Sequence, residues 1–114
     1  MSTYRMFYDD QGNPRASFAE PPAGRGLIAL WLQMDIGGNA GWCQELIDQA
    51  AAVVQSGQGS VDVTGNLFGV TVTPDRTQIE NVYNEDDAVE LASSELVAIL
   101  RDWRELLSAR SASA

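Results

Sequence analysis

The chain has 114 residues and a formal net charge of -9, with 16 acidic residues, no histidine, and seven basic residues that are all arginine. Such a negative field attracts basic surfaces and repels phosphate backbones, which argues against nucleic acid as a direct partner. The missing histidine and lysine are the commonest general base and the usual amine nucleophile. We therefore expect a binding protein and no enzymatic activity.

The length fits one ordinary folded domain, and we expect a single domain over 1–114 with a frayed tail at 108–114. The longest apolar run, Leu27–Leu32, is far shorter than the ~20 residues that span a bilayer, and the start leads directly into a strand-like segment. A single cysteine, Cys43, allows no internal disulfide and fits a packing role. These features predict a cytoplasmic protein.

The first half of the chain predicts a hairpin, a buried segment and a helix. Residues 4–18 alternate apolar and polar side chains around turn-forming residues at 10–14, which is typical of a β-hairpin. Leu27–Leu32 is apolar on both faces and short enough for a buried strand, with a helix as the alternative. From Trp42 to Ser56 apolar residues recur at spacings of three and four, which predicts an amphipathic helix that ends at a glycine.

The second half predicts a β-meander followed by a helix. Three alternating segments, residues 61–63, 68–72 and 77–83, are separated by turn residues. The apolar residues of 96–107 then form one helical stripe, and Ser93 or Ser94 is placed to cap it. The order of elements indicates an α+β fold in which an antiparallel sheet of hairpin and meander strands packs against two amphipathic helices.

A run of carboxylates near an aromatic residue is the sharpest local feature. It supports two interpretations. The residues can plug a cationic cleft, with Tyr83 as the aromatic anchor. Alternatively, Asn84 caps a short helix whose first turn carries the acids. The candidate partner-binding residues are Glu80, Tyr83, Glu85, Asp86, Asp87 and Glu90.

Other functional patterns are weak. The acid run lacks the alternating ligands and the glycine turn of a calcium loop, and the glycines at 24–26 and 37–39 match no nucleotide fingerprint. We expect no catalytic residue, metal or cofactor. Trp31, Trp42 and Trp103 fit core positions, with Trp42 also a candidate contact residue because it starts its helix beside a glycine.

The segment Val82–Leu91 followed by a helix with Trp103 resembles small bacterial immunity proteins, which neutralise toxins of contact-dependent growth inhibition and similar systems. The Tyr/Phe-Asp-Gly hairpin and the Glu45–Ala51 helix resemble the YacL-like family. The immunity resemblance implies a non-enzymatic inhibitor of a cognate toxin, often a nuclease with a basic cleft. An acidic surface agrees with that expectation because it imitates the charge of the substrate.

Two further classes of function stay open. An exposed strand edge or helix stripe can form a symmetric homodimer, which predicts a structural or regulatory domain without a toxin partner. A small carboxylate-dependent or metal-assisted enzyme is the third class, but chance carboxylate pairs are inevitable among 16 acids, so a pair of acids is a weak signal for it. The leading hypothesis is an immunity protein that binds a basic protein partner through the acid run.

Overall fold

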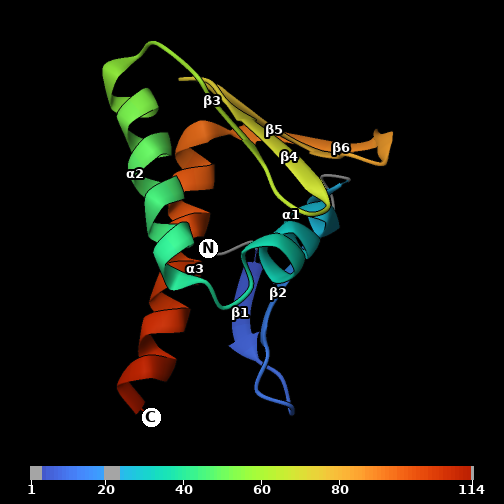
Figure 1. The fold of residues 1–114 in the computed structure, drawn as a ribbon, viewed down its shortest axis with the longest axis vertical. Helices are drawn as coiled ribbons and strands as arrows, with labels where there is room; N and C mark the ends of the chain where they lie inside the picture. The colour runs from blue at the N-terminus through green and yellow to red at the C-terminus, as the bar shows by residue number, and fades with distance from the viewer. Residues whose placement is uncertain (1–3, 20–23, 114) are drawn as a thin grey trace.

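The computed structural model describes residues 4–19 and 24–113, which form two antiparallel sheets and three helical regions in an α+β arrangement (Figure 1). The expected fold class is confirmed. The elements in chain order are β1 (Tyr4–Tyr8), β2 (Pro14–Phe18), α1 (Arg25–Trp31), the π-helical segment η1 (Leu32–Ile36), α2 (Ala40–Ser56), β3 (Val61–Thr64), β4 (Phe68–Val72), β5 (Arg76–Asn81), β6 (Asn84–Ala92) and α3 (Ser93–Ser113).

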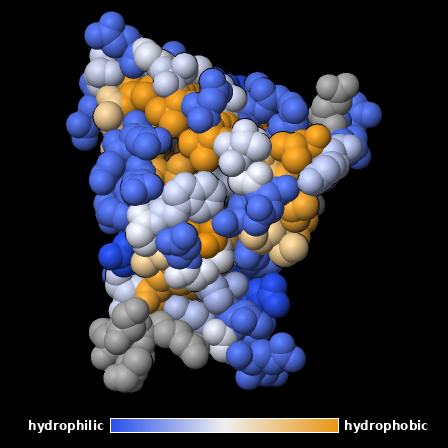
Figure 2. Space-filling model, viewed as in Figure 1, coloured by the Kyte–Doolittle hydropathy of each residue, from blue (hydrophilic) through white to orange (hydrophobic). Residues whose placement is uncertain are grey.

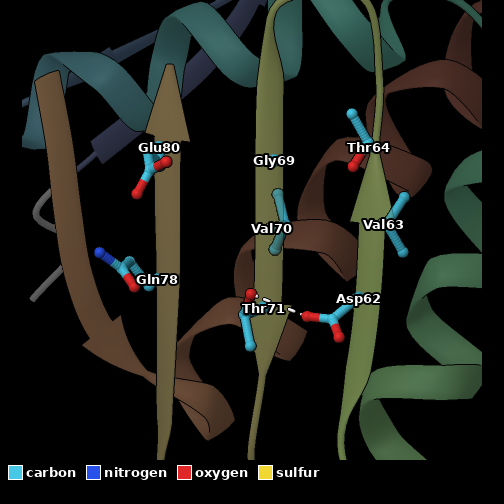
Figure 3. A pocket seen from close by; sticks show the side chains of 8 residues that line it. All are labelled: Asp62, Val63, Thr64, Gly69, Val70, Thr71, Gln78 and Glu80. Carbon is cyan, nitrogen blue, oxygen red and sulfur yellow. Dashed lines mark hydrogen bonds between the residues drawn. The ribbon is translucent and has the colours of Figure 1, made fainter. Parts of the chain in front are cut away.

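The predicted meander forms the larger sheet, with strands in the order β3-β4-β5-β6. Its two faces differ because successive side chains of a strand point to opposite sides. Val70, Ile79 and Val89 lie in one register row and are buried against the helices. Polar residues such as Thr71 and Gln78 lie on the other face, where they are exposed (Figure 3). We call this second side the outer face.

Helices α2 and α3 lie side by side and supply much of the core (Figure 1). The α2 helix begins at Ala40, where the Asn39 side chain accepts a hydrogen bond from the Trp42 amide at 3.0 Å, and ends at Gly57 with a positive φ. The predicted amphipathic helix is therefore confirmed, with a start two residues earlier. Trp103 of α3 is fully buried and its indole donates to the Gly37 carbonyl at 2.9 Å.

The segment Leu27–Leu32 is helical, so the expected buried strand is wrong and the alternative of a helix holds. Ile28, Trp31 and Leu32 are buried at helical spacing, while Leu30 is 46% exposed. The segment packs against β2 on one side and β6 on the other. This double burial makes nearly every position apolar and hides the helical period.

The start of α3 is tied to the sheet by a buried serine. Ser93, expected as a helix cap, is the first residue of the helix, and its hydroxyl donates to the Thr73 carbonyl at 2.6 Å. It also lies 2.8 Å from the buried Thr77 hydroxyl. Because buried hydroxyls need partners, this pairing satisfies both groups where the last strand meets the last helix.

The first hairpin joins α3 through two tyrosines. The Tyr4 hydroxyl donates to the Asp102 carboxylate, and the Tyr8 hydroxyl donates to the Leu106 carbonyl at 3.1 Å. Burial, together with the hydrogen bond to the negative Asp102, raises the pKa of Tyr4 well above its ordinary value. The hairpin is therefore held to the far end of α3 by polar contacts as well as by the stacked rings of Tyr4 and Phe18.

A single carboxylate connects η1 to the larger sheet. Asp35 accepts the backbone amides of Leu67 at 3.1 Å and Phe68 at 3.0 Å, at the turn between β3 and β4. The approach is so close that a Cβ on Gly65 would lie 2.5 Å from Asp35 Oδ2. Glycine at this turn therefore leaves room for the carboxylate.

We predict that Asp35→Ala lowers the free energy of unfolding by about 2–3 kcal/mol, because two amides lose a charged acceptor. Gly65→Ala should cost about 1–3 kcal/mol through overlap with that carboxylate. In the double variant the two costs should be less than additive by about 1 kcal/mol or more, because they remove one interaction. Urea denaturation measures all three. The control is Gly38→Ala, where an added Cβ meets nothing within 4 Å; fully additive costs would contradict the coupling.

Candidate functional site

The acid run lies on a β-strand. Asn84 opens β6, which pairs antiparallel with β5 through Glu80↔Ala88 and Ile79↔Val89. The alternative in which Asn84 caps a short helix is therefore wrong. Pairing with β5 determines the conformation, while the asparagine and acids alone are compatible with a helix start. A register shift at Glu80/Asn81 places extra β6 residues opposite that point.

Side chains hold the hairpin turn in place. Asn81 Oδ1 accepts the Tyr83 amide at 2.9 Å, and Asn84 Oδ1 accepts the Asp86 amide at 3.2 Å. The Val82 amide donates to the Leu67 carbonyl at 2.9 Å, which joins this turn to the β3–β4 turn. Because these hydrogen bonds already order the turn, binding of a partner costs little further conformational entropy there.

The structure brings together only part of the predicted site. Tyr83 is 79% exposed at the turn, and Asp86 and Asp87 are exposed beside it on β6. We call Val82, Tyr83, Asp86 and Asp87 the hairpin tip. Asp87 Oδ2 accepts a hydrogen bond from the side-chain Nδ2 of Asn81 at 3.5 Å. No ion pair joins Asp86 or Asp87 to another described residue.

The other three predicted residues stand apart from the tip. Glu80 is half-buried on the outer face of β5. Glu90 lies on the same face further along β6, where it forms a long 3.9 Å ion pair with Arg76. Glu85 belongs to β6, but its side chain lies outside the described residues. Of the six predicted residues, Tyr83, Asp86 and Asp87 therefore lie together at the tip, while Glu80 and Glu90 lie on the outer face.

Several large apolar side chains are exposed. The largest among the described residues are Leu30, Met34, Val82 and Tyr83. Two hydrogen bonds connect the segment of Met34 to that of Val82. Asp35, next to Met34, accepts the Leu67 amide, and the Leu67 carbonyl accepts the Val82 amide. Figure 2 shows hydrophobic side chains reaching the surface over α1 and the adjoining end of the sheet. Sequence reasoning identified Tyr83 but missed the exposure of Leu30, Met34 and Val82.

Sequence reasoning also missed a hollow in the outer face beside the tip. It has a volume of about 220 Å³ and opens over Gly69, the second residue of β4 (Figure 3). Glu80 is the only predicted residue among those that line it. The others with polar side chains are Asp62, Thr64, Thr71 and Gln78. A glycine inside an alternating strand was the available signal, because it marks a bulge or a close approach by another group.

Several carboxylates elsewhere have structural roles. Arg25 makes two hydrogen bonds of 2.9 Å to Glu95, which join α1 to α3. Asp9 accepts the Gln11 and Asn13 amides and pairs with Arg15 at 2.9 Å, so these contacts lower its pKa. Acids are thus distributed over many elements, but the hairpin of β5 and β6 carries four between Thr77 and Val89 with no arginine.

The described residues offer little for covalent or metal chemistry. No group of three or more histidine, cysteine, aspartate or glutamate residues within the described ranges is placed to hold a metal ion. Cys43 is fully buried, its thiol donates to the Leu100 carbonyl at 3.5 Å, and burial raises its pKa to about 11. A buried, protonated thiol is a poor nucleophile, so Cys43 fits the packing role expected for it.

No protein-family model, curated protein or solved structure matches this chain. The resemblance to immunity proteins and to the YacL-like family therefore stays a prediction. Across residues 4–19 and 24–113, no helix has the length and apolar character needed to cross a membrane.

We predict that Cys43 of the native protein reacts with a thiol-specific reagent at about pH 8 at least about 100-fold more slowly than in the urea-unfolded protein, because both burial and the raised pKa suppress the thiolate. Absorbance of the released chromophore measures the rate. The unfolded chain is the positive control. Rapid labelling of the folded protein would contradict the buried position of this side chain.

Proposed function

We propose that this chain is a non-enzymatic immunity protein that binds and neutralises a cognate toxin through its acidic hairpin. The supporting observation is the hairpin tip, where a 79% exposed tyrosine stands beside exposed carboxylates that have no ion pair within the described residues. A partner with a basic, concave surface complements this projection. A nuclease cleft has that chemistry because it binds phosphates.

Charge and aromatic contact have separate roles in the proposed complex. The carboxylates raise the rate of encounter with a basic partner, because opposite fields steer the two molecules together. Tyr83 then supplies a rigid contact of the kind that dominates interface energies. The bonds from Asn81, Asn84 and Leu67 hold the turn before the partner arrives, which lowers the entropy cost of binding.

The proposal places this activity in the cytoplasm, where an immunity protein meets a toxin that has entered the cell. A single buried thiol agrees with a reducing compartment. The net charge of -9 also agrees with a protein that avoids nucleic acid while it competes for a nucleic-acid-binding cleft.

Neutralisation is tested by growth. Immunity genes of the resembling families follow their toxin genes, so the product of the reading frame directly upstream is expressed in cells with and without this chain. The proposal expects growth arrest without the chain and normal growth with it. Arrest that the chain does not relieve, or an upstream product that causes no arrest, counts against the immunity function.

We predict that replacing Glu80, Glu85, Asp86, Asp87 and Glu90 by their amides slows association with the toxin about tenfold or more at low salt and flattens the dependence on salt, because steering falls with the local field. Stopped-flow fluorescence measures the rates. The matched control replaces Asp10, Glu45, Asp48, Asp75 and Glu105, five exposed acids on other elements.

Both variants change the net charge from -9 by five, to -4, so only the location of the lost charges differs. The control variant should associate within about threefold of the native rate, since steering depends on charges near the contact. Equal slowing of the two variants would remove the acid run from the mechanism and leave only the total charge.

We predict that Tyr83→Ala accelerates dissociation about tenfold or more, which corresponds to about 1.4 kcal/mol, while association stays nearly unchanged. The free energy of unfolding should change by about 0.5 kcal/mol or less, because the ring is exposed. Tyr8→Phe is the control for loss of a hydroxyl distant from the tip. An unchanged dissociation rate would show that Tyr83 is no anchor.

A further inference from the structure

Gly69 occupies a position where the fold does not require glycine. It is the second residue of β4, an interior strand, where glycine weakens a sheet because it has no side chain to pack. Its φ is not positive. A Cβ added there would meet only Val82 Cγ1, at an ordinary 3.8 Å. A β-branched residue would therefore suit this strand better, and the missing side chain needs another reason.

The missing side chain opens the hollow of about 220 Å³ on the outer face. Thr64, Gly69 and Glu80 lie in one register row, so the threonine and the glutamate stand on either side of the glycine. The next row carries Asp62, Thr71 and Gln78. In Figure 3 the Glu80 and Gln78 side chains project from β5 on one side, with Thr64 and Asp62 across on β3.

The lining favours a hydrogen-bond donor with positive charge. Thr71 Oγ1 donates its proton to Asp62 Oδ1 at 2.9 Å, so the hydroxyl keeps only acceptor capacity for a ligand. Glu80 forms no ion pair with any described residue. No arginine lines the hollow. Asp62 and Glu80 therefore line a space that holds no cation from the described residues. In Figure 3 the Asp62 carboxylate reaches toward Thr71, and the Glu80 carboxylate lies on the β6 side of β5, so Glu80 would turn toward Gly69 to bind a ligand.

We infer that this hollow is the binding site for the guanidinium group of one arginine of the basic partner. A guanidinium is flat, carries five N–H donors in a rigid fork and pairs with a carboxylate through two hydrogen bonds. Here Glu80 would receive that fork, and the bare backbone at Gly69 would form a flat floor. The apolar stem of the arginine would run along Val82 toward the tip, since Val82 adjoins Gly69.

This inference rests on the proposed function for the identity of the partner, but the site itself can be tested without one. The probe is N-acetyl-arginine amide, whose guanidinium is its sole charge, titrated into isotope-labelled native protein and followed by the backbone amide signals. We expect saturable shifts at Thr64, Gly69 and Glu80, and at least about fivefold weaker binding of N-acetyl-lysine amide, because an ammonium lacks the planar fork.

Two variants separate the hollow from general attraction. Gly69→Val should abolish the shifts by filling the floor, while its thermal midpoint stays equal or rises, because valine favours a strand. Glu80→Gln should weaken binding about tenfold, since a charge-assisted pair is lost. Asp75→Asn removes an equal charge from the exposed turn between β4 and β5, outside the hollow, and should bind within about twofold of the native protein. Gly69→Ala replaces the valine variant if that variant fails to fold.

Undiminished binding by the folded Gly69→Val protein, equal binding of the lysine amide, or shifts confined to the hairpin tip would each overturn the arginine site. The two proposals fail separately. Saturable arginine binding that depends on Gly69 and Glu80 supports the hollow even where the growth assay is negative. Protection from a toxin that the Gly69→Val variant provides as well as the native chain supports immunity and overturns the hollow.

Discussion

The contact between the Asp35 carboxylate and the β3–β4 turn links the fold to the candidate site. The carboxylate holds the Leu67 and Phe68 amides, and the Leu67 carbonyl holds the Val82 amide of the neighbouring turn. Val82 in turn adjoins Gly69 on the outer face. Two turns, the tip and the hollow are therefore positioned by one charged group at the end of a helix. Because hydrogen bonds to charged groups are stronger than neutral ones, the Asp35 carboxylate holds the β3–β4 turn more strongly than a neutral acceptor would.

The acidic residues divide into those that stabilise the fold and those that face outward without a partner. Asp9 binds amides and an arginine within the first hairpin, whereas Asp35 and Glu95 connect elements distant in sequence. Asp86 and Glu80 form no ion pair with the described residues. Like charges close together oppose folding unless something offsets them, and the basic partner proposed above would supply that offset.

Local patterns in the sequence predicted much of the fold. The periods of α2 and α3 and the alternation of β4 are unambiguous, because each element has one buried and one exposed side. The pattern failed at Leu27–Leu32, where burial on two sides removes the contrast on which periodicity depends. It was ambiguous at Asn84, because the caps of a helix and the turns of a hairpin use the same residues.

The candidate site was predictable only in part, for a related reason. Tyr83 and its acidic neighbours are consecutive in the chain, so their proximity could be seen in the sequence. The Gly69 hollow is lined by residues of three strands. The close approach of Asp35 to Gly65 joins residues that are far apart in the sequence, so local patterns do not predict it. Such features depend on register and packing, which single-sequence patterns do not contain.

The attachment of β1 to α3 has a consequence for the order of assembly during synthesis. Tyr4 and Tyr8 find their partners 98 residues later, on Asp102 and Leu106. The ribosome releases the amino-terminal hairpin long before that helix exists, so β2 can pack against α1 and η1 while the two tyrosine hydroxyls still lack their partners. Closure of so long a loop is slow. A nascent chain stalled before Asp102 therefore lacks both polar contacts between β1 and α3.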